Sequence, residues 1–237
     1  MRIEIRGMVE TSLLDWDGMI VSTLYTPYCN FRCPYCQNSS LIFNPEKYPL
    51  MPFKVISSHL QRHKGWIDGI CLTGGEPTLF EDLLEFIKES RSLGFRVKLD
   101  TNGTNPEVLK VALEEKLISY IAMDIKAPLN LKAYQESTGI KNEDLLKRVE
   151  ESIKIIMGSS IDYEFRTTVV PNLHKREDIE EIARYIRGAK RYILQNFVPQ
   201  ETLDPEYLKI KPYPLEVLKE FCRSASSYVE KCTERGK

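Results

Sequence analysis

One stretch decides the fold: Gly69–Asp100, which reads GICLTGGEPTLFEDLLEFIKESRSLGFRVKLD. Its two ends, Gly69–Thr73 and Arg96–Asp100, are short β-rich runs of the kind that form strands. Between them, leucine and isoleucine recur at helical spacing over Leu79–Leu93, and Gly94 is a typical helix stop. A strand, a helix and a second strand in this order predict a right-handed βαβ unit with parallel strands.

The same alternation extends over most of the chain. Further strands are expected at Met19–Tyr25, Tyr120–Ile125, Tyr163–Val170 and Tyr192–Val198. Further helices are expected at Glu107–Lys116 after Pro106, at Asn142–Met157, at Arg176–Arg187 and at about 214–231. Six strands with helices between them predict an α/β protein with an open, partial (β/α)6 barrel; a doubly wound parallel sheet is the alternative. The absence of linker-like or low-complexity segments predicts one domain over residues 1–237.

Composition excludes several classes of protein. The chain has 33 basic and 34 acidic residues, a net charge of −1, and 42% apolar residues, which indicates an ordinary globular protein. A balanced charge gives no reason to expect a nucleic-acid or membrane partner. No apolar run is long enough to span a membrane, and the N-terminus lacks the apolar centre of a signal peptide. A reducing cytoplasm is therefore expected, where cysteines serve as ligands or thiols rather than disulfides.

Three of the six cysteines fall within eight residues. Cys29, Cys33 and Cys36 have the spacing C-x3-C-x2-C after the first expected strand. Three thiolates on one loop can hold an iron–sulfur cubane and leave one iron open to a substrate atom. A zinc site would need a fourth ligand, so zinc and three unrelated thiols are the weaker alternatives.

The remaining cysteines and the histidine pair have simpler interpretations. Cys71 is expected in the core, and Cys222 and Cys232 are expected on the last helix as packing or exposed residues. His59 and His63 are four residues apart and are expected on the surface.

Charged side chains interrupt strands that should be almost wholly apolar in a parallel sheet. On one face of three strand ends lie Lys98 with Asp100, Asp124 with Lys126, and Glu164 with Arg166. The carboxyl ends of barrel strands meet at one mouth, so these residues predict a polar ligand pocket. The alternative is a self-contained ion network, in which Asp100 and Asp124 pair with Lys126 and Glu164 pairs with Arg166.

The cysteine loop, followed by Thr73-Gly74-Gly75-Glu76-Pro77, resembles the radical S-adenosylmethionine (radical SAM) superfamily, whose partial barrel also matches the expected strands. Within it the chain is similar to the glycyl-radical-enzyme activases, above all those for anaerobic ribonucleoside-triphosphate reductase. The segments that carry this likeness are Ser12–Trp16, Leu99–Gly103, Met123–Pro128 and Glu164–Thr168.

This resemblance implies a [4Fe-4S] cluster on Cys29, Cys33 and Cys36, and reductive cleavage of S-adenosylmethionine to a 5′-deoxyadenosyl radical. It implies no catalytic residue beyond the cluster-bound cofactor. The residues implied to bind the cofactor are Tyr35, Cys36, Gln37, Gly74, Gly75, Glu76, Asp100, Asp124, Ile125, Lys126 and Arg166. It also suggests a monovalent cation at Asp100 and Asp124.

The implied partner is a glycyl radical enzyme, the large subunit of anaerobic ribonucleotide reductase, with reduced ferredoxin or flavodoxin as the electron donor. The segments Gln37–Leu50 and Asn130–Asn142 are expected to form the docking rim. Two positions depart from the activases: Tyr28 replaces a small glycine, and Val198 replaces a histidine that contacts the cofactor. Two alternatives stay open, namely a radical SAM enzyme for a small molecule or RNA, and a non-enzymatic metal-binding module.

Overall fold

The computed structural model describes residues 2–236, and within it the chain forms two compact units. The first unit consists of Met1–Asn30, Ser40–Thr101 and Glu107–Ile121. The second consists of Phe31–Ser39, Asn102–Pro106 and Ala122–Lys237. Most of the cysteine loop therefore belongs to the second unit, while its first cysteine belongs to the first.

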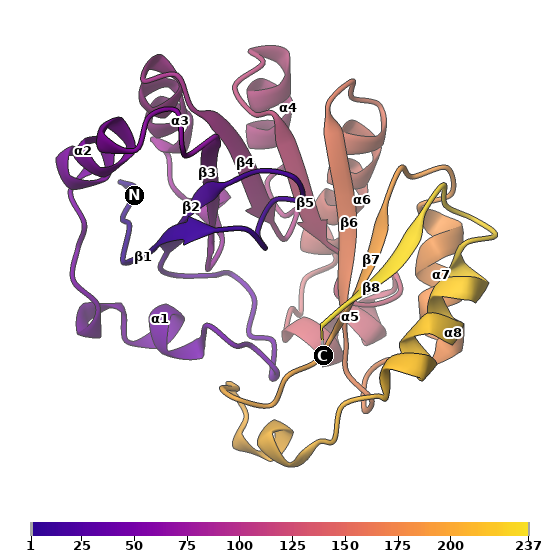
Figure 1. Cartoon of the computed structure of the whole chain (residues 1–237). Coiled ribbons are helices and arrows are strands. Elements are labelled where there is room, and N and C mark those ends of the chain that lie inside the picture. Colours follow the sequence, from indigo (N-terminus) through magenta and orange to yellow (C-terminus); the bar gives the residue numbers. More distant parts are fainter. Residues whose placement is uncertain (1, 237) are drawn as a thin grey trace. The chain divides into compact units, whose positions relative to one another are not determined.

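The first unit is built on four neighbouring strands, drawn from indigo to magenta in Figure 1. They are β1 (Gly7–Ser12), β2 (Val21–Thr26), β3 (Gly69–Gly74) and β4 (Arg96–Thr101). β1 is antiparallel to β2, whereas β2, β3 and β4 are parallel to one another. Most residues of the parallel strands are buried, including Lys98 of β4.

Helices follow the strands of this unit. Their bounds are α1 (Ser39–Phe43), α2 (Phe53–Arg62), α3 (Leu83–Ser92) and α4 (Pro106–Glu114), with short 3-10 helices at Pro45–Lys47 and Pro77–Leu79. In α3, Leu83, Phe86 and Ile87 recur at helical spacing and are buried, and the chain turns at Gly94 with a φ of 96°.

Three parallel strands form the sheet of the second unit: β6 (Asp162–Val169), β7 (Tyr192–Asn196) and β8 (Cys232–Arg235). Its helices are α5 (Leu131–Thr138), α6 (Glu143–Met157), α7 (Arg176–Tyr185) and α8 (Leu215–Ala225), with a 3-10 helix at Pro205–Lys209. α7 and α8 lie side by side, and α8 also packs against β8 (Figure 1).

Strand β5 (Tyr120–Asp124) crosses the division between the units. At its start, the N–H of Ser119 donates to the Val97 carbonyl of β4 at 2.8 Å. At its end, the N–H of Ile125 donates to the Arg166 carbonyl of β6 at 2.8 Å. The end of β5 therefore carries Asp124 alongside β6.

All six expected strands are present, shifted by at most two residues at either end. The structure adds β1 and β8, which are incompletely buried. The helix expected over about residues 214–231 is shorter, because α8 ends at Ala225 and Cys232 starts β8. The side chain of Ser226 donates to the Cys222 carbonyl at 2.8 Å and so occupies an acceptor at the helix end.

The pair His59 and His63 also differs from expectation. His59 is buried on α2, and its Nε2 lies 3.2 Å from both the Ser22 hydroxyl and the Glu10 carbonyl, so the expectation of a surface residue is wrong. Across residues 2–236, no helix has the length and hydropathy needed to cross a membrane.

Candidate active site

The cysteine loop begins with a residue in an unusual backbone conformation. Tyr28 has a φ of 61°, in the left-handed region that favours glycine. Its ring packs against Phe80 at a centroid distance of 6.5 Å, and its carbonyl accepts the N–H of Glu76 at 2.8 Å. The glycine that commonly stands here in the activases would adopt this conformation without strain.

None of the three loop cysteines is in a disulfide, and all are buried or half-buried. Within the second unit, the N–H of Cys36 donates to the Cys33 carbonyl at 3.1 Å, which closes a tight turn. Burial raises the pKa of Cys36, although the backbone N–H of Asn38 and the charge of Lys126 act in the opposite direction. Among the described residues, no three His, Cys, Asp or Glu side chains are arranged as a metal site. Three thiols on one short loop are nevertheless the donor set that iron–sulfur clusters use.

Two glycines at the end of β3, Gly74 and Gly75, allow one backbone to lie directly against another. A Cβ on Gly75 would lie 1.7 Å from the Tyr28 carbonyl oxygen, and one on Gly74 would lie 2.4 Å from the Thr26 carbonyl oxygen. The N–H of Gly75 donates to the same Thr26 carbonyl at 2.8 Å. Both positions therefore require glycine.

Glu76 follows these glycines and is fully buried. Its Oε1 accepts from the Thr78 N–H at 3.1 Å, the Thr78 hydroxyl at 2.6 Å and the Thr101 hydroxyl at 2.8 Å. The carboxylate thus fixes the turn after β3 and ties it to the end of β4.

Asp100 lies on β4, where the structure pairs it with the buried ammonium group of Lys98 at 3.1 Å. Lys98 also donates to the Asp15 carbonyl, and the thiol of Cys71 lies 3.7 Å from Oδ1 of Asp100. Cys71 itself is fully buried, as expected for a core residue.

In the second unit, Asp124 at the end of β5 lies between two cations. Its Oδ2 accepts from Lys126 at 2.9 Å, and its Oδ1 accepts from Nε of Arg166 at 2.8 Å. Burial raises the pKa of Asp124, but Arg166 and Lys126 outweigh it and lower the pKa to about 2. For Lys126, burial lowers the pKa and Asp124 raises it by more. The three groups carry a net charge of +1 at neutral pH.

The observed ion pairs include one pair expected from the sequence, Asp124 with Lys126, and add others. Arg166 pairs with Asp124, and Glu164 is paired with Arg235 of β8 at 3.4 Å. Asp100 pairs with Lys98. Ile125, on the opposite face from Asp124 and Lys126, is fully buried.

Residues 31–39 are fastened to a distant segment, which we call the strap (residues 198–209). Gln37 Nε2 donates to the Val198 carbonyl at 2.8 Å. Val198 therefore contacts the cysteine loop through its backbone carbonyl. The Ser39 hydroxyl donates to Glu201 at 2.9 Å, and the N–H of Asp204 donates to the Pro34 carbonyl at 2.9 Å.

Tyr35 completes this arrangement at the centre of the loop. Its ring lies 6.5 Å from that of Tyr207, and its hydroxyl is buried with no hydrogen-bond partner among the described residues. A buried hydroxyl without a partner indicates a position suited to a polar ligand atom.

One residue of this site has no signal in the sequence. The Val170 N–H donates to Nδ1 of His174 at 3.0 Å, so the proton lies on Nε2, which donates to the Lys126 carbonyl at 2.8 Å. His174 is fully buried and fixes the backbone that carries Lys126. A single histidine after a strand gives no pattern from which this role could be predicted.

The chain matches the family model described as the radical SAM superfamily over residues 23–187, and it belongs to that superfamily. A Methanocaldococcus jannaschii protein named "Putative glycyl-radical enzyme activating enzyme" is 32% identical over 97% of this chain and 95% of its own length. A Thermoplasma acidophilum protein named "7-carboxy-7-deazaguanine synthase" is 26% identical over 62% of this chain and 66% of its own length.

Solved structures support the fold. Streptococcus suis SuiB bound to S-adenosylmethionine matches with a TM-score of 0.66 and 20% identity, over 88% of this chain and 48% of SuiB. The chain thus spans about half the length of SuiB. The fold is the α/β partial barrel of radical SAM proteins, and the cofactors are a [4Fe-4S] cluster and S-adenosylmethionine.

Proposed function

We propose that this radical SAM enzyme activates a glycyl radical enzyme by removing a hydrogen atom from a glycine Cα of that partner. The observation that carries the proposal is the match to the M. jannaschii protein, because it extends over nearly the full length of both chains. When bound, the cluster and S-adenosylmethionine supply a 5′-deoxyadenosyl radical that takes a hydrogen atom from carbon. A glycine Cα has no side chain to obstruct approach.

The cluster ligands in this proposal are Cys29, Cys33 and Cys36. Their thiols are within one loop, and the bonds from the strap to Pro34 and Gln37 hold the middle of that loop in place. Cys33 is buried and Cys36 is half-buried, which would limit access of water to the metal.

Two groups of residues would hold S-adenosylmethionine. Gly74 and Gly75, at the end of β3, would contribute backbone groups, as the family resemblance implies; the space that a Cβ would take at each is filled by the carbonyl oxygens of Thr26 and Tyr28. Lys126 and Arg166 place two cationic hydrogen-bond donors beside Asp124, and cationic donors of this kind suit the carboxylate of an amino-acid ligand. The proposed contacts also include Tyr35, Cys36, Gln37, Glu76, Asp100 and Ile125.

The finer assignments follow the resemblance of the sequence. We propose the large subunit of anaerobic ribonucleotide reductase as the partner and reduced ferredoxin or flavodoxin as the electron donor. We also propose a cytoplasmic location, as the sequence predicts. A monovalent cation at Asp100 and Asp124 stays a prediction, as does a single domain over residues 1–237.

A second candidate function is turnover of a small molecule. The match to a protein named for 7-carboxy-7-deazaguanine synthesis favours it, although that match covers a smaller part of both chains. The two functions differ in where the hydrogen atom originates, and this difference can be measured.

The experiment mixes reduced holoenzyme, S-adenosylmethionine and a purified large subunit of anaerobic ribonucleotide reductase. Electron paramagnetic resonance should show the doublet of a glycyl radical. Two controls should lack it: a partner in which the radical-bearing glycine is replaced by alanine, and a Cys33→Ala variant of this chain. The proposal is wrong if 5′-deoxyadenosine forms in the presence of glycyl radical enzymes and none of them acquires the doublet.

A further inference from the structure

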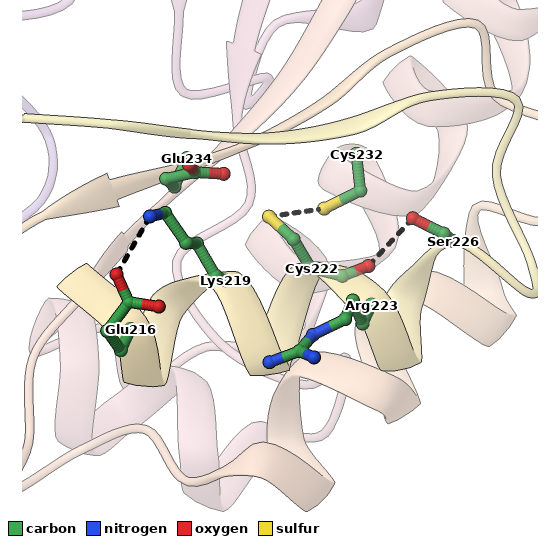
Figure 2. Close-up of a pocket in the computed structure, with 7 residues that line it drawn as sticks. All are labelled: Glu216, Lys219, Cys222, Arg223, Ser226, Cys232 and Glu234. Carbon is green, nitrogen blue, oxygen red and sulfur yellow. Dashed lines mark hydrogen bonds and ion pairs between the residues drawn. The ribbon is translucent and has the colours of Figure 1, made fainter.

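Two cysteines outside the cysteine loop face each other at a pocket between α8 and β8. The thiol of Cys232 donates to Sγ of Cys222, with 3.0 Å between the sulfur atoms (Figure 2). Neither is in a disulfide. A disulfide bond is about 2.0 Å long, so a shift of about 1 Å would bring the sulfurs to bonding distance.

The pocket gives a small reagent access to this pair. Its volume is about 410 Å³, and the residues that line it with the cysteines are Glu216, Lys219, Arg223, Ser226 and Glu234. Two cations and two carboxylates balance, so the lining favours neither an anionic nor a cationic reagent. Cys222 is buried, whereas Cys232 is half-buried, so a reagent in the pocket meets Cys232 first.

The surrounding structure can accommodate a bond between the two sulfurs. Cys232 is the first residue of β8, and Cys222 lies in the last turns of α8. The connection between them, residues 226–231, has no regular secondary structure. A bridge would close a short loop and would leave the pairing of β8 with β7 in place.

From this geometry we propose that Cys222 and Cys232 are a site of reversible disulfide formation, driven by exchange with a low-molecular-weight disulfide, R–S–S–R. The thiolate of Cys232 attacks one sulfur of the reagent, forms a mixed disulfide and releases R–S⁻. The thiolate of Cys222 then attacks Sγ of Cys232, forms the Cys222–Cys232 bond and releases the second R–S⁻. Two electrons pass from the cysteines to the reagent, and the two protons that they lose yield two molecules of R–SH.

This inference does not depend on the proposed activase function. The hydrogen bond to Cys222 and burial raise the pKa of Cys232. Exchange is therefore slow at neutral pH, and the test is run at pH 9. The anaerobic holoenzyme is incubated with 2-hydroxyethyl disulfide, which is small and uncharged. Acid quenching, alkylation of remaining thiols and peptide mass spectrometry then assign each cysteine.

The wild-type protein should yield a peptide pair bridged through Cys222 and Cys232 and lighter by two hydrogen atoms, and added dithiothreitol should reverse it. Cys222→Ser should retain a mixed disulfide on Cys232. In Cys232→Ser, Cys222 should be labelled roughly tenfold more slowly than Cys232 is labelled in Cys222→Ser, because Cys222 is buried. Cys71, fully buried in β3, is the internal control and should stay a thiol.

Two results would overturn the inference. One is a wild-type protein in which Cys222 and Cys232 stay alkylatable after the cluster-bearing loop or Cys71 has been oxidised. The other is a mixed disulfide that persists on wild-type Cys232, since a resolving thiol at 3.0 Å should displace it.

Discussion

Gly75 has no room for a side chain, because the carbonyl oxygen of Tyr28 occupies the place of a Cβ. We expect Gly75→Ala to lower the free energy of unfolding by roughly 1–3 kcal/mol, since a backbone atom has to move. Urea denaturation measures the change. Gly7→Ala is the matched control, because its Cβ would meet only ordinary contacts at 3.5 Å and beyond, and its effect should stay within about 0.5 kcal/mol. An equal effect at both glycines would contradict the close approach.

The lowered pKa of Asp124 predicts that the stability of the protein depends on pH. That pKa falls from an ordinary 3.8 to about 2 in the folded protein, so the unfolded chain binds the proton more tightly. The ion pairs therefore add stability that is complete above about pH 4 to 5 and is lost as the pH falls toward 2. Because the side chain is partly exposed, the contribution is about 1–2 kcal/mol.

The measurement compares the wild type with Asp124→Asn in urea at pH values from 3 to 7. The difference in unfolding free energy between the two proteins should shrink as the pH falls. A difference that is constant over this range would show that the carboxylate is not held in its charged form by Lys126 and Arg166.

Between elements, His174 connects the end of β6 to the segment after β5. Burial lowers the pKa of His174, and its two hydrogen bonds require the neutral ring. The unfolded chain therefore takes up the proton more readily, and the contribution of His174 to stability is present above about pH 6.5 and decreases below it.

Replacement by phenylalanine, His174→Phe, should remove this pH dependence and leave the Val170 N–H without its acceptor, at a cost of about 1–3 kcal/mol. His63→Phe is the control, because His63 is only partly buried. Thermal unfolding at pH 5.5 and 7.5 tests the prediction. If the wild type loses no more stability than His174→Phe between these pH values, the neutral ring has no such role.

The strap is a second connection between elements. Replacing both Gln37 and Ser39 by alanine removes two bonds to the strap, each worth about 0.5–1.5 kcal/mol. Hydrogen exchange of residues 33–39 should accelerate roughly 5- to 100-fold, while exchange in β3 stays unchanged. Gln61→Ala, at an exposed position on α2, provides the control. Unchanged exchange in the loop would mean that the strap does not restrain it.

The same elements explain how far the sequence predicts this molecule. Strand β3 was predictable because its first four residues, Gly69–Leu72, are buried and include the apolar run Ile-Cys-Leu. β8, with the sequence Cys-Thr-Glu-Arg, carries no such pattern and is defined by its pairing with β7. The helix α5 was missed because its buried residues are Tyr134, Ser137 and Thr138, which do not form an apolar stripe.

Within the site, features formed by neighbouring residues could be predicted from the sequence, whereas contacts between distant residues could not. The cysteine spacing and the two glycines could be read from neighbouring residues. The pairing of Arg166 with Asp124, and of Glu164 with Arg235, depends on which strands lie together and so required the structure. The strap was not predicted for the same reason.

For the whole molecule, binding of the cluster should stabilise the folded state, because a ligand that binds only the folded protein raises the unfolding temperature. Anaerobic reconstitution should give about four irons and four sulfides per chain and a clear increase in Tm. Cys33→Ala should lose iron and the increase in Tm, whereas Cys71→Ala should keep both. Stoichiometric zinc, or full iron content in Cys33→Ala, would contradict the proposed ligands.

The strap also bears on how the protein is made. Gln37 bonds to a carbonyl 161 residues further along the chain. At a ribosomal rate of about 5–20 residues per second, roughly 8–30 seconds pass between synthesis of the cysteine loop and synthesis of the strap. During this interval the three thiols are in a loop without that restraint, open to stray metals and oxidants. Delivery of iron and sulfide is therefore best timed after the last third of the chain has left the ribosome.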